Sequence, residues 1–214
     1  MLRLSKVDEL ILPDHYYLGS SDDCRFLREY IPHVGFSGGE TNNLIGNFKK
    51  PVNRRGLPDW RYKERAIRQV ARELASALNF AWLDKHATLV PIPPSKTKSH
   101  PLYDDRMTQA LNLLGPMVGA NCDVRELIVQ VEDMEAAHTS DERPSPVEIR
   151  ANYAIDENLV SPTPKVIGLF DDLLTTGAHF RAAKGLLQDR FSEVPIIGIF
   201  VARRIIPEIE WEVS

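Results

Sequence analysis

Short apolar runs alternate with helical apolar stripes along the second half of the chain. Runs with the length of buried strands occur at residues 87–93, 127–131, 166–170 and 195–202. Stripes with apolar positions three and four residues apart occur at residues 103–118 and 178–189. This alternation predicts an α/β fold with a mostly parallel sheet, helices on both faces and right-handed crossovers.

The first part of the chain is dominated by helical stripes. The clearest one predicts a helix over about residues 62–84, and a shorter helix is expected after Thr41. The polar residues 20–23 are expected to cap a third helix through Phe26, Leu27 and Tyr30. We therefore expect two parts, an N-terminal helical cap or hood over residues 1–85 and an α/β core over residues 86–214.

One stretch, residues 165–189, combines a strand, two acids, a polar turn and a helix. The apolar run is followed at once by Asp171 and Asp172, and then by the turn Thr175-Thr176-Gly177. The N-terminus of the next helix offers free backbone N–H groups and a positive dipole end, which favour a phosphate. Gly177 lets the backbone approach an anion closely. The simpler alternative is that the carboxylates only cap the helix.

The sequence FDDLLTTGAHF, residues 170–180, resembles the phosphoribosyl-pyrophosphate (PRPP) signature of type I phosphoribosyltransferases. The resemblance implies that fold, and it implies that Asp171 and Asp172 contact the ribose hydroxyls and take part in catalysis. It further implies that the 5′-phosphate is bound by the turn and its neighbours, which are Leu174, Thr175, Thr176, Gly177, Ala178 and His179. His179 stands where the family usually has a threonine, so one phosphate-facing hydroxyl is absent.

Three further segments resemble the ComF branch of these proteins, which is related to amidophosphoribosyltransferases. VPIPPSK takes the place of the pyrophosphate loop, which implies pyrophosphate contacts by Pro94, Ser95 and Lys96. Residues 106–110 resemble the opening of the next helix, and residues 148–153 resemble the segment before the signature strand. The resemblance covers residues 44–204, weakly before residue 86. The Cys-rich zinc module with which ComF proteins commonly begin has no counterpart here.

Several candidate side chains have a structural interpretation beside the functional one. Lys96 and Lys98 either hold pyrophosphate oxygens or lie on a solvated loop. Arg106 either projects with Gln109 toward the strand ends or forms an ion pair with a neighbouring aspartate. Both alternatives stay open at the level of the sequence.

The stretch from Glu132 to Arg150 is charged, contains two prolines and predicts a mobile flap. His138 and Arg143 lie on it, where they could close over the anomeric carbon and its leaving group. The alternative is an exposed histidine in an acidic loop.

Composition places few limits on function. The 214 residues are 43% hydrophobic, and the two cysteines give neither a zinc cluster nor a disulfide framework. The absence of a secretory pattern and of a membrane-length apolar run makes a cytoplasmic protein the expectation. The formal net charge is −4, but residues 49–68 carry +6 from eight basic and two acidic side chains. This basic segment either meets nucleic acid or another phosphate, or is a solvated surface.

The resemblance implies an Mg²⁺-dependent phosphoribosyltransferase that moves 5-phosphoribosyl from PRPP to a nitrogen acceptor and releases pyrophosphate. Mg²⁺ would arrive on PRPP, with Asp171 and Asp172 as further candidate ligands. The alternative is a non-catalytic PRPP- or nucleotide-binding protein in DNA uptake, DNA processing or regulation. A nucleic-acid-binding protein on an α/β scaffold is the third hypothesis. The acceptor cannot be read from the sequence, no membrane partner is expected, and a homodimer stays open.

Overall fold

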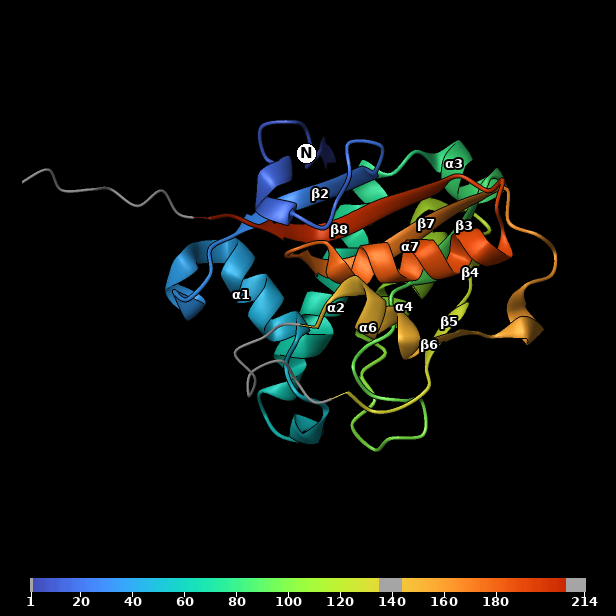
Figure 1. Cartoon of the computed structure of the whole chain (residues 1–214). Helices are drawn as coiled ribbons and strands as arrows, with labels where there is room; N and C mark the ends of the chain where they lie inside the picture. Colours follow the sequence, from blue (N-terminus) through green and yellow to red (C-terminus); the bar gives the residue numbers. More distant parts are fainter. Residues whose placement is uncertain (1, 135–143, 207–214) are drawn as a thin grey trace, which may run out of the picture.

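The computed structural model describes residues 2–134 and 144–206, and these form an α/β fold around a six-stranded sheet (Figure 1). The strand order is β1 (Ser5–Lys6), β2 (Asp23–Tyr30), β8 (Ile196–Arg204), β7 (Val166–Leu174), β3 (Ala87–Pro91) and β4 (Asp123–Val124). Only the edge strand β1 is antiparallel to its neighbour. The expected mostly parallel α/β sheet is therefore confirmed.

Helices cover both faces of the sheet. One face carries α1 (Gly39–Phe48), α2 (Trp60–Ala77), α3 (Phe80–Lys85), α4 (Arg106–Asn112) and α5 (Leu114–Val118). The other face carries α6 (Pro146–Ala151), α7 (Ala178–Arg190) and the antiparallel hairpin of β5 (Ile128–Gln130) and β6 (Tyr153–Ile155). Short 3-10 helices lie at Leu12–His15, Gly35–Gly38, Val52–Arg54 and Glu157–Leu159. Among the described residues, no helix has the length and apolar character needed to cross a membrane.

The alternation of side chains along β7 divides the core into two layers. Ile167 and Leu169 pack with α7, whereas Phe170 packs with α1, α2 and α4. Gly168 lies between Ile167 and Leu169 in the strand, and a Cβ there would lie 2.8 Å from Cη2 of Trp82. The close approach of this ring explains why the strand carries a glycine at its centre.

Residues 23–30 form a strand, so the expected helix through Phe26, Leu27 and Tyr30 is wrong. β2 pairs in parallel with β8 from Asp23 to Tyr30 and buries Phe26 on the α7 side and Leu27 on the opposite side. The polar residue before it caps no helix, because Asp22 is buried and accepts hydrogen bonds from Lys184 (2.6 Å) and Arg181 (3.1 Å) of α7. The pairing partner lies more than 170 positions away, and helical spacing alone could not reveal it.

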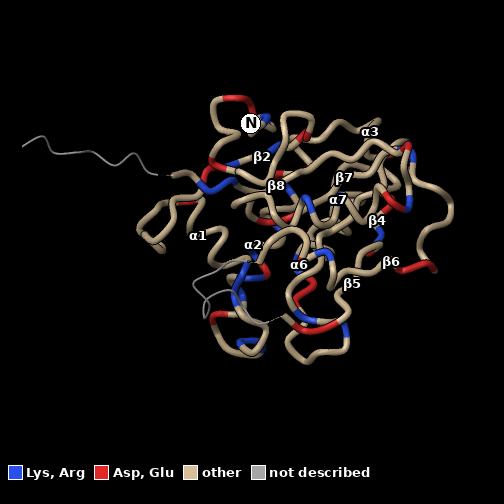
Figure 2. The backbone as a smooth tube through the Cα atoms, viewed as in Figure 1, with Lys and Arg blue, Asp and Glu red and all other residues tan. Residues whose placement is uncertain are grey.

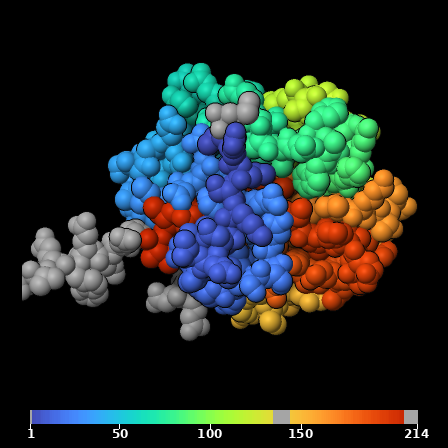
Figure 3. All heavy atoms as spheres, turned by 90° about the horizontal axis from the view of Figure 1, so that it is seen from above, coloured from blue at the N-terminus to red at the C-terminus, as the bar shows by residue number. Residues whose placement is uncertain are grey.

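The N-terminal residues lie against the C-terminal part of the chain. In the space-filling view of Figure 3, the dark blue N-terminal segment lies among orange and red residues of the last third. Residues 1–85 thus supply β1 and β2 to the sheet, as well as α1, α2 and α3 to one face.

Several element boundaries differ from the expected ones. The helix expected over 62–84 is interrupted at Leu78, and Asn79 caps α3 through the Trp82 N–H. The strand expected over 127–131 belongs to the hairpin, and the short β4 takes the edge of the main sheet. The end of the expected flap is α6, which begins with a capping box between Ser145 and Glu148.

Candidate functional site

A cavity of about 640 Å³ lies at the carboxyl ends of β3 and β7. From β3 the chain proceeds to β4 on one side, and from β7 it proceeds to β8 on the other side. This reversal of strand order leaves a crevice outside the strand ends, which is where ligands bind in open α/β sheets. The walls come from the ends of both strands, the start of α7, the C-terminal end of α1, and α4 with the loop before it.

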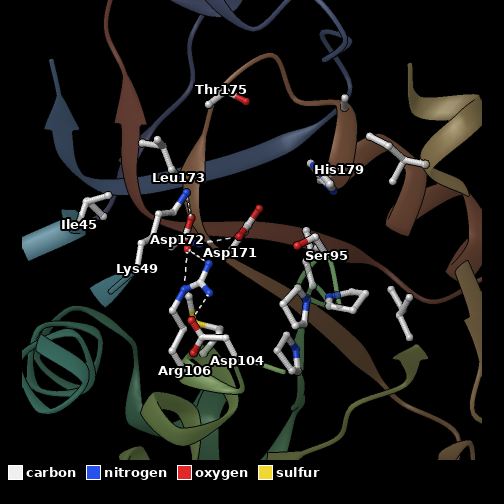
Figure 4. A pocket seen from close by; sticks show the side chains of 18 of the residues that line it. Ile45, Lys49, Ser95, Asp104, Arg106, Asp171, Asp172, Leu173, Thr175 and His179 are labelled. Carbon is white, nitrogen blue, oxygen red and sulfur yellow. Dashed lines mark hydrogen bonds and ion pairs between the residues drawn. The ribbon is translucent and has the colours of Figure 1, made fainter. Parts of the chain in front are cut away.

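Asp171 and Asp172 point to different sides of the β7 end. The strand continues to Leu174, and successive side chains of a strand alternate between faces. Figure 4 shows the Asp171 carboxylate directed away from Lys49 and Arg106, toward the side of Ser95 and His179. The two acids are therefore adjacent in sequence but have different neighbours.

Asp172 is held between two cations. Its Oδ1 lies 2.9 Å from Lys49 Nζ, and its Oδ2 accepts hydrogen bonds from Arg106 Nε (2.9 Å) and Nη2 (2.5 Å). The Asp172 side chain is 5% exposed. A carboxylate so deeply buried requires compensation of this kind, because an isolated buried charge is very costly.

The same network continues into α2. Arg106 Nη1 donates to Asp104 at 2.8 Å, and Asp104 also accepts a hydrogen bond from Lys63 Nζ at 2.7 Å. Lys63 is buried and donates in addition to the backbone carbonyls of Phe48 and Lys50, each at 2.9 Å. All three donors of the ammonium group are thus used, and the chain of charges links α1, α2, α4 and β7.

The pKa values of the two acids shift in opposite directions. Burial and the nearby charge of Asp172 raise the pKa of Asp171 above its ordinary value. Burial alone would also raise the pKa of Asp172, but Lys49 and Arg106 outweigh it and lower that pKa. Asp172 is thus an anion at neutral pH, and Asp171 is the member of the pair that binds a proton more readily.

The N-terminal segment forms hydrogen bonds to the turn after β7. His15 Nδ1 donates to the Thr175 carbonyl, and the Tyr17 N–H donates to the Thr176 carbonyl at 3.0 Å. Gly177 has φ +86°, and a Cβ there would lie 2.7 Å from Leu18 Cδ2. Position 177 therefore requires glycine for both conformation and space.

The start of α7 opens onto the cavity. Thr175, Thr176, Ala178 and His179 line the cavity, whereas Leu174 is buried in the core and Gly177 is buried under Leu18. The first turn of a helix has N–H groups without intrahelical acceptors, and its dipole is positive there. His179 is paired through Nδ1 with the Tyr153 hydroxyl at 3.0 Å.

The loop after β3 forms the facing wall. Pro94 and Ser95 line the cavity, but Lys96 is not among its lining residues. Lys98 Nζ lies 2.7 Å from Glu126, so this lysine is held in an ion pair. His138 and Arg143, the two residues expected on the flap, lie outside the described residues.

The structure adds three residues that the sequence hypotheses did not place at the site. They are Lys49 at the end of α1, Lys63 in α2 and His15 behind the turn. Lys63 had a usable signal, because it lies on the buried stripe four residues before Ile67. Arg106 joins both an adjacent aspartate and Asp172, while Gln109 instead donates to Asp105 at 2.6 Å.

The residues fit Mg²⁺ only as an ion that arrives with a ligand. Within residues 2–134 and 144–206, no group of three or more acidic, His or Cys side chains is arranged to hold a metal. Of the two acids that end β7, Asp172 is already compensated by two cations, whereas Asp171 is open to an ion. Mg²⁺ is commonly bound by one or two carboxylates together with substrate phosphates, and Asp171 is compatible with that arrangement.

A scan against models of known protein families gives no match for this chain. A search of the curated proteins gives none either.

Proposed function

We propose that this protein binds PRPP in the cavity between the ends of β3 and β7 and transfers the phosphoribosyl group to a nitrogen acceptor. The observation that carries the proposal is the placement of two sequence motifs on facing walls of one cavity. VPIPPSK begins in the last two residues of β3, and DDLLTTG runs from the end of β7 into the following turn, on either side of the reversal in strand order. The resemblance of both motifs to the phosphoribosyltransferase family adds support.

In this proposal the turn Thr175-Thr176-Gly177 and the start of α7 bind the 5′-phosphate. The phosphate is remote from the reacting carbon, so its role is to align the ribose. Asp171 faces the cavity and accepts hydrogen bonds from ribose hydroxyls. Asp172 keeps Lys49 and Arg106 in position beside the same cavity.

The reaction breaks the bond between the anomeric carbon and a pyrophosphate oxygen, and it forms a bond from the acceptor nitrogen to that carbon. The proton that the nitrogen loses passes to solvent. The electron pair of the broken bond leaves with pyrophosphate, so positive charge develops on the sugar. An ionised Asp171 beside the ribose stabilises that positive charge. Pro94 and Ser95 lie where the leaving group would be, and Mg²⁺ bound to the diphosphate would neutralise part of its charge.

Calorimetric titration with PRPP and Mg²⁺ tests the binding step. We expect the wild-type protein to bind, Asp171→Asn to bind at least tenfold more weakly, and Asp189→Asn, an exposed acid on α7, to bind normally. Failure of the folded wild-type protein to bind PRPP contradicts the proposal. Unchanged affinity in Asp171→Asn would mean that the ribose lies elsewhere.

A second candidate function is a PRPP- or nucleotide-binding protein without transferase activity. The observation that favours it is that Asp172 is paired with Lys49 and Arg106, so that one of the two acids is not free to accept hydrogen bonds from the ribose hydroxyls. A screen for pyrophosphate release across nucleobases and amine donors separates the two functions. PRPP binding without release for any acceptor supports the binding protein.

A further inference from the structure

α2 has two faces of opposite character. Its inner face carries the buried Lys63 and the apolar stripe, and its outer face carries four exposed arginines, Arg61, Arg65, Arg68 and Arg72. Spacings of four, three and four residues place them in one line along the helix. At 1.5 Å per residue, this line is about 16 Å long. Figure 2 shows basic residues in blue along this helix and the loop before it.

Four cations of the basic segment, residues 49–68, are held in ion pairs, and a fifth, Arg55, lies over the Trp60 ring at 5.4 Å. Lys49 pairs with Asp172, Lys50 and Arg54 pair with Asp59, and Lys63 pairs with Asp104. Within residues 2–134 and 144–206, no ion pair involves the four outer arginines. The line of arginines, with the exposed Arg55 before it and one exposed acid, Glu64, beside it, therefore presents a net positive charge outward, although the whole chain is acidic.

An exposed aromatic ring lies among these charges. Tyr62 is 39% exposed, and the guanidinium groups of Arg61 and Arg65 lie 5.1 and 5.8 Å from its ring centroid. Lys50 Nζ lies 5.9 Å from the same centroid. The ring is thus an accessible flat surface surrounded by cations, and bases stack on such surfaces in single-strand-binding proteins.

A groove of about 620 Å³ between α1 and α2 begins at this ring. Tyr62, Arg65 and Gln69 come from α2, and Asn43 and Asn47 come from α1. Glu40 is the one acid among its lining residues. The mixture of amides, an aromatic ring and a guanidinium group offers both stacking and hydrogen bonding to a base edge.

We propose that the outer face of α2, with the adjoining groove, binds single-stranded nucleic acid. The arginine line contacts successive phosphates, and an unpaired base stacks on Tyr62 and enters the groove. A duplex presents the same phosphates but keeps its bases stacked internally, so it cannot use the ring or the groove. This inference does not depend on PRPP binding, because the arginines lie on the face of α2 opposite to Lys63 and the cavity network.

Fluorescence anisotropy with a labelled 20-nucleotide oligo(dT), the matching RNA and a 20-base-pair duplex tests the proposal on the full chain. Four phosphate contacts predict a slope of about −3 in log affinity against log salt, or about a 50-fold loss between 50 and 200 mM salt. Changing all four arginines to glutamine should remove that dependence. Tyr62→Ala should weaken single-strand binding about tenfold and leave the salt slope unchanged.

The controls separate nucleic acid from other anions. Arg190→Gln, on α7 across the sheet, should bind like the wild type. The substituted side chains are exposed, and thermal melting will show that each variant stays folded. No binding at 50 mM salt, unchanged binding by the fourfold variant, or equal binding of single strand and duplex overturns the proposal. If unlabelled poly-glutamate displaces the labelled strand as effectively as unlabelled oligo(dT) does, the proposal is also overturned, in favour of an acidic protein partner.

Discussion

The two sides of the β7 end differ although each presents one aspartate. On the side of α1, α2 and α4, Asp172 is buried in a chain of alternating charges that reaches Lys63. On the other side, Asp171 faces the cavity toward His179 and Ser95 (Figure 4). One acid of the pair is thus neutralised by cations within the fold, while the other faces the open cavity.

The largest effect should follow from removing the buried anion. Asp172→Asn takes from Lys49 and Arg106 their shared carboxylate and leaves Asp104 as the remaining acid beside the buried Arg106. Removing one partner of a buried ion pair costs about 3 kcal/mol in the free energy of unfolding. Urea denaturation at neutral pH measures the loss, with Asp171→Asn as the matched control. Equal stability of the two variants would remove the distinction between the two sides.

The next effect concerns the far end of the charge network. Lys63→Met removes the ammonium group from Asp104 and from two backbone carbonyls, and it should cost about 2 kcal/mol because Arg106 still compensates Asp104. A double-mutant cycle with Asp104→Asn measures the coupling between the two residues. Additive losses would mean that the two charges do not stabilise each other.

A smaller, pH-dependent effect is expected at Asp171. Because its pKa is raised in the folded state, the protonated form contributes stability that is present at low pH and lost as the pH rises from the unfolded pKa through the folded one. Asp171→Asn cannot lose stability in this way. When the pH rises from about 5 to about 8, the free energy of unfolding of the variant should therefore increase relative to that of the wild type by on the order of 1 kcal/mol. Thermal melting at both pH values measures it. A relative gain toward low pH would show that the folded pKa is lowered instead.

The smallest effect is expected at Lys49, whose side chain is 42% exposed. Lys49→Gln should cost less than about 1 kcal/mol, because Arg106 remains bound to Asp172 and water screens an exposed ion pair. Urea denaturation at low and high salt measures this cost. A loss as large as that of Asp172→Asn would show that Lys49, rather than Arg106, is the main partner.

Residues 165–189 show how much the sequence by itself determined. Each step there is encoded locally: an apolar run for the strand, a polar turn with Gly177, and a stripe for α7. The same local signals predicted β3, the α/β class and a site at the strand ends. Periodicity is sufficient for such elements, since each buries a face that its own residues define.

Only the tertiary structure decided which partners these elements meet. Residues 23–30 became a strand because β8 offered an unpaired edge, and Lys63 became buried because Asp104 and two carbonyls surround its ammonium group. In the same way, Lys49 from the first half of the chain pairs with Asp172 in the second half and lowers the pKa of its carboxyl group. Pairing of strands and compensation of buried charges depend on residues far apart in sequence, so no local pattern specifies them.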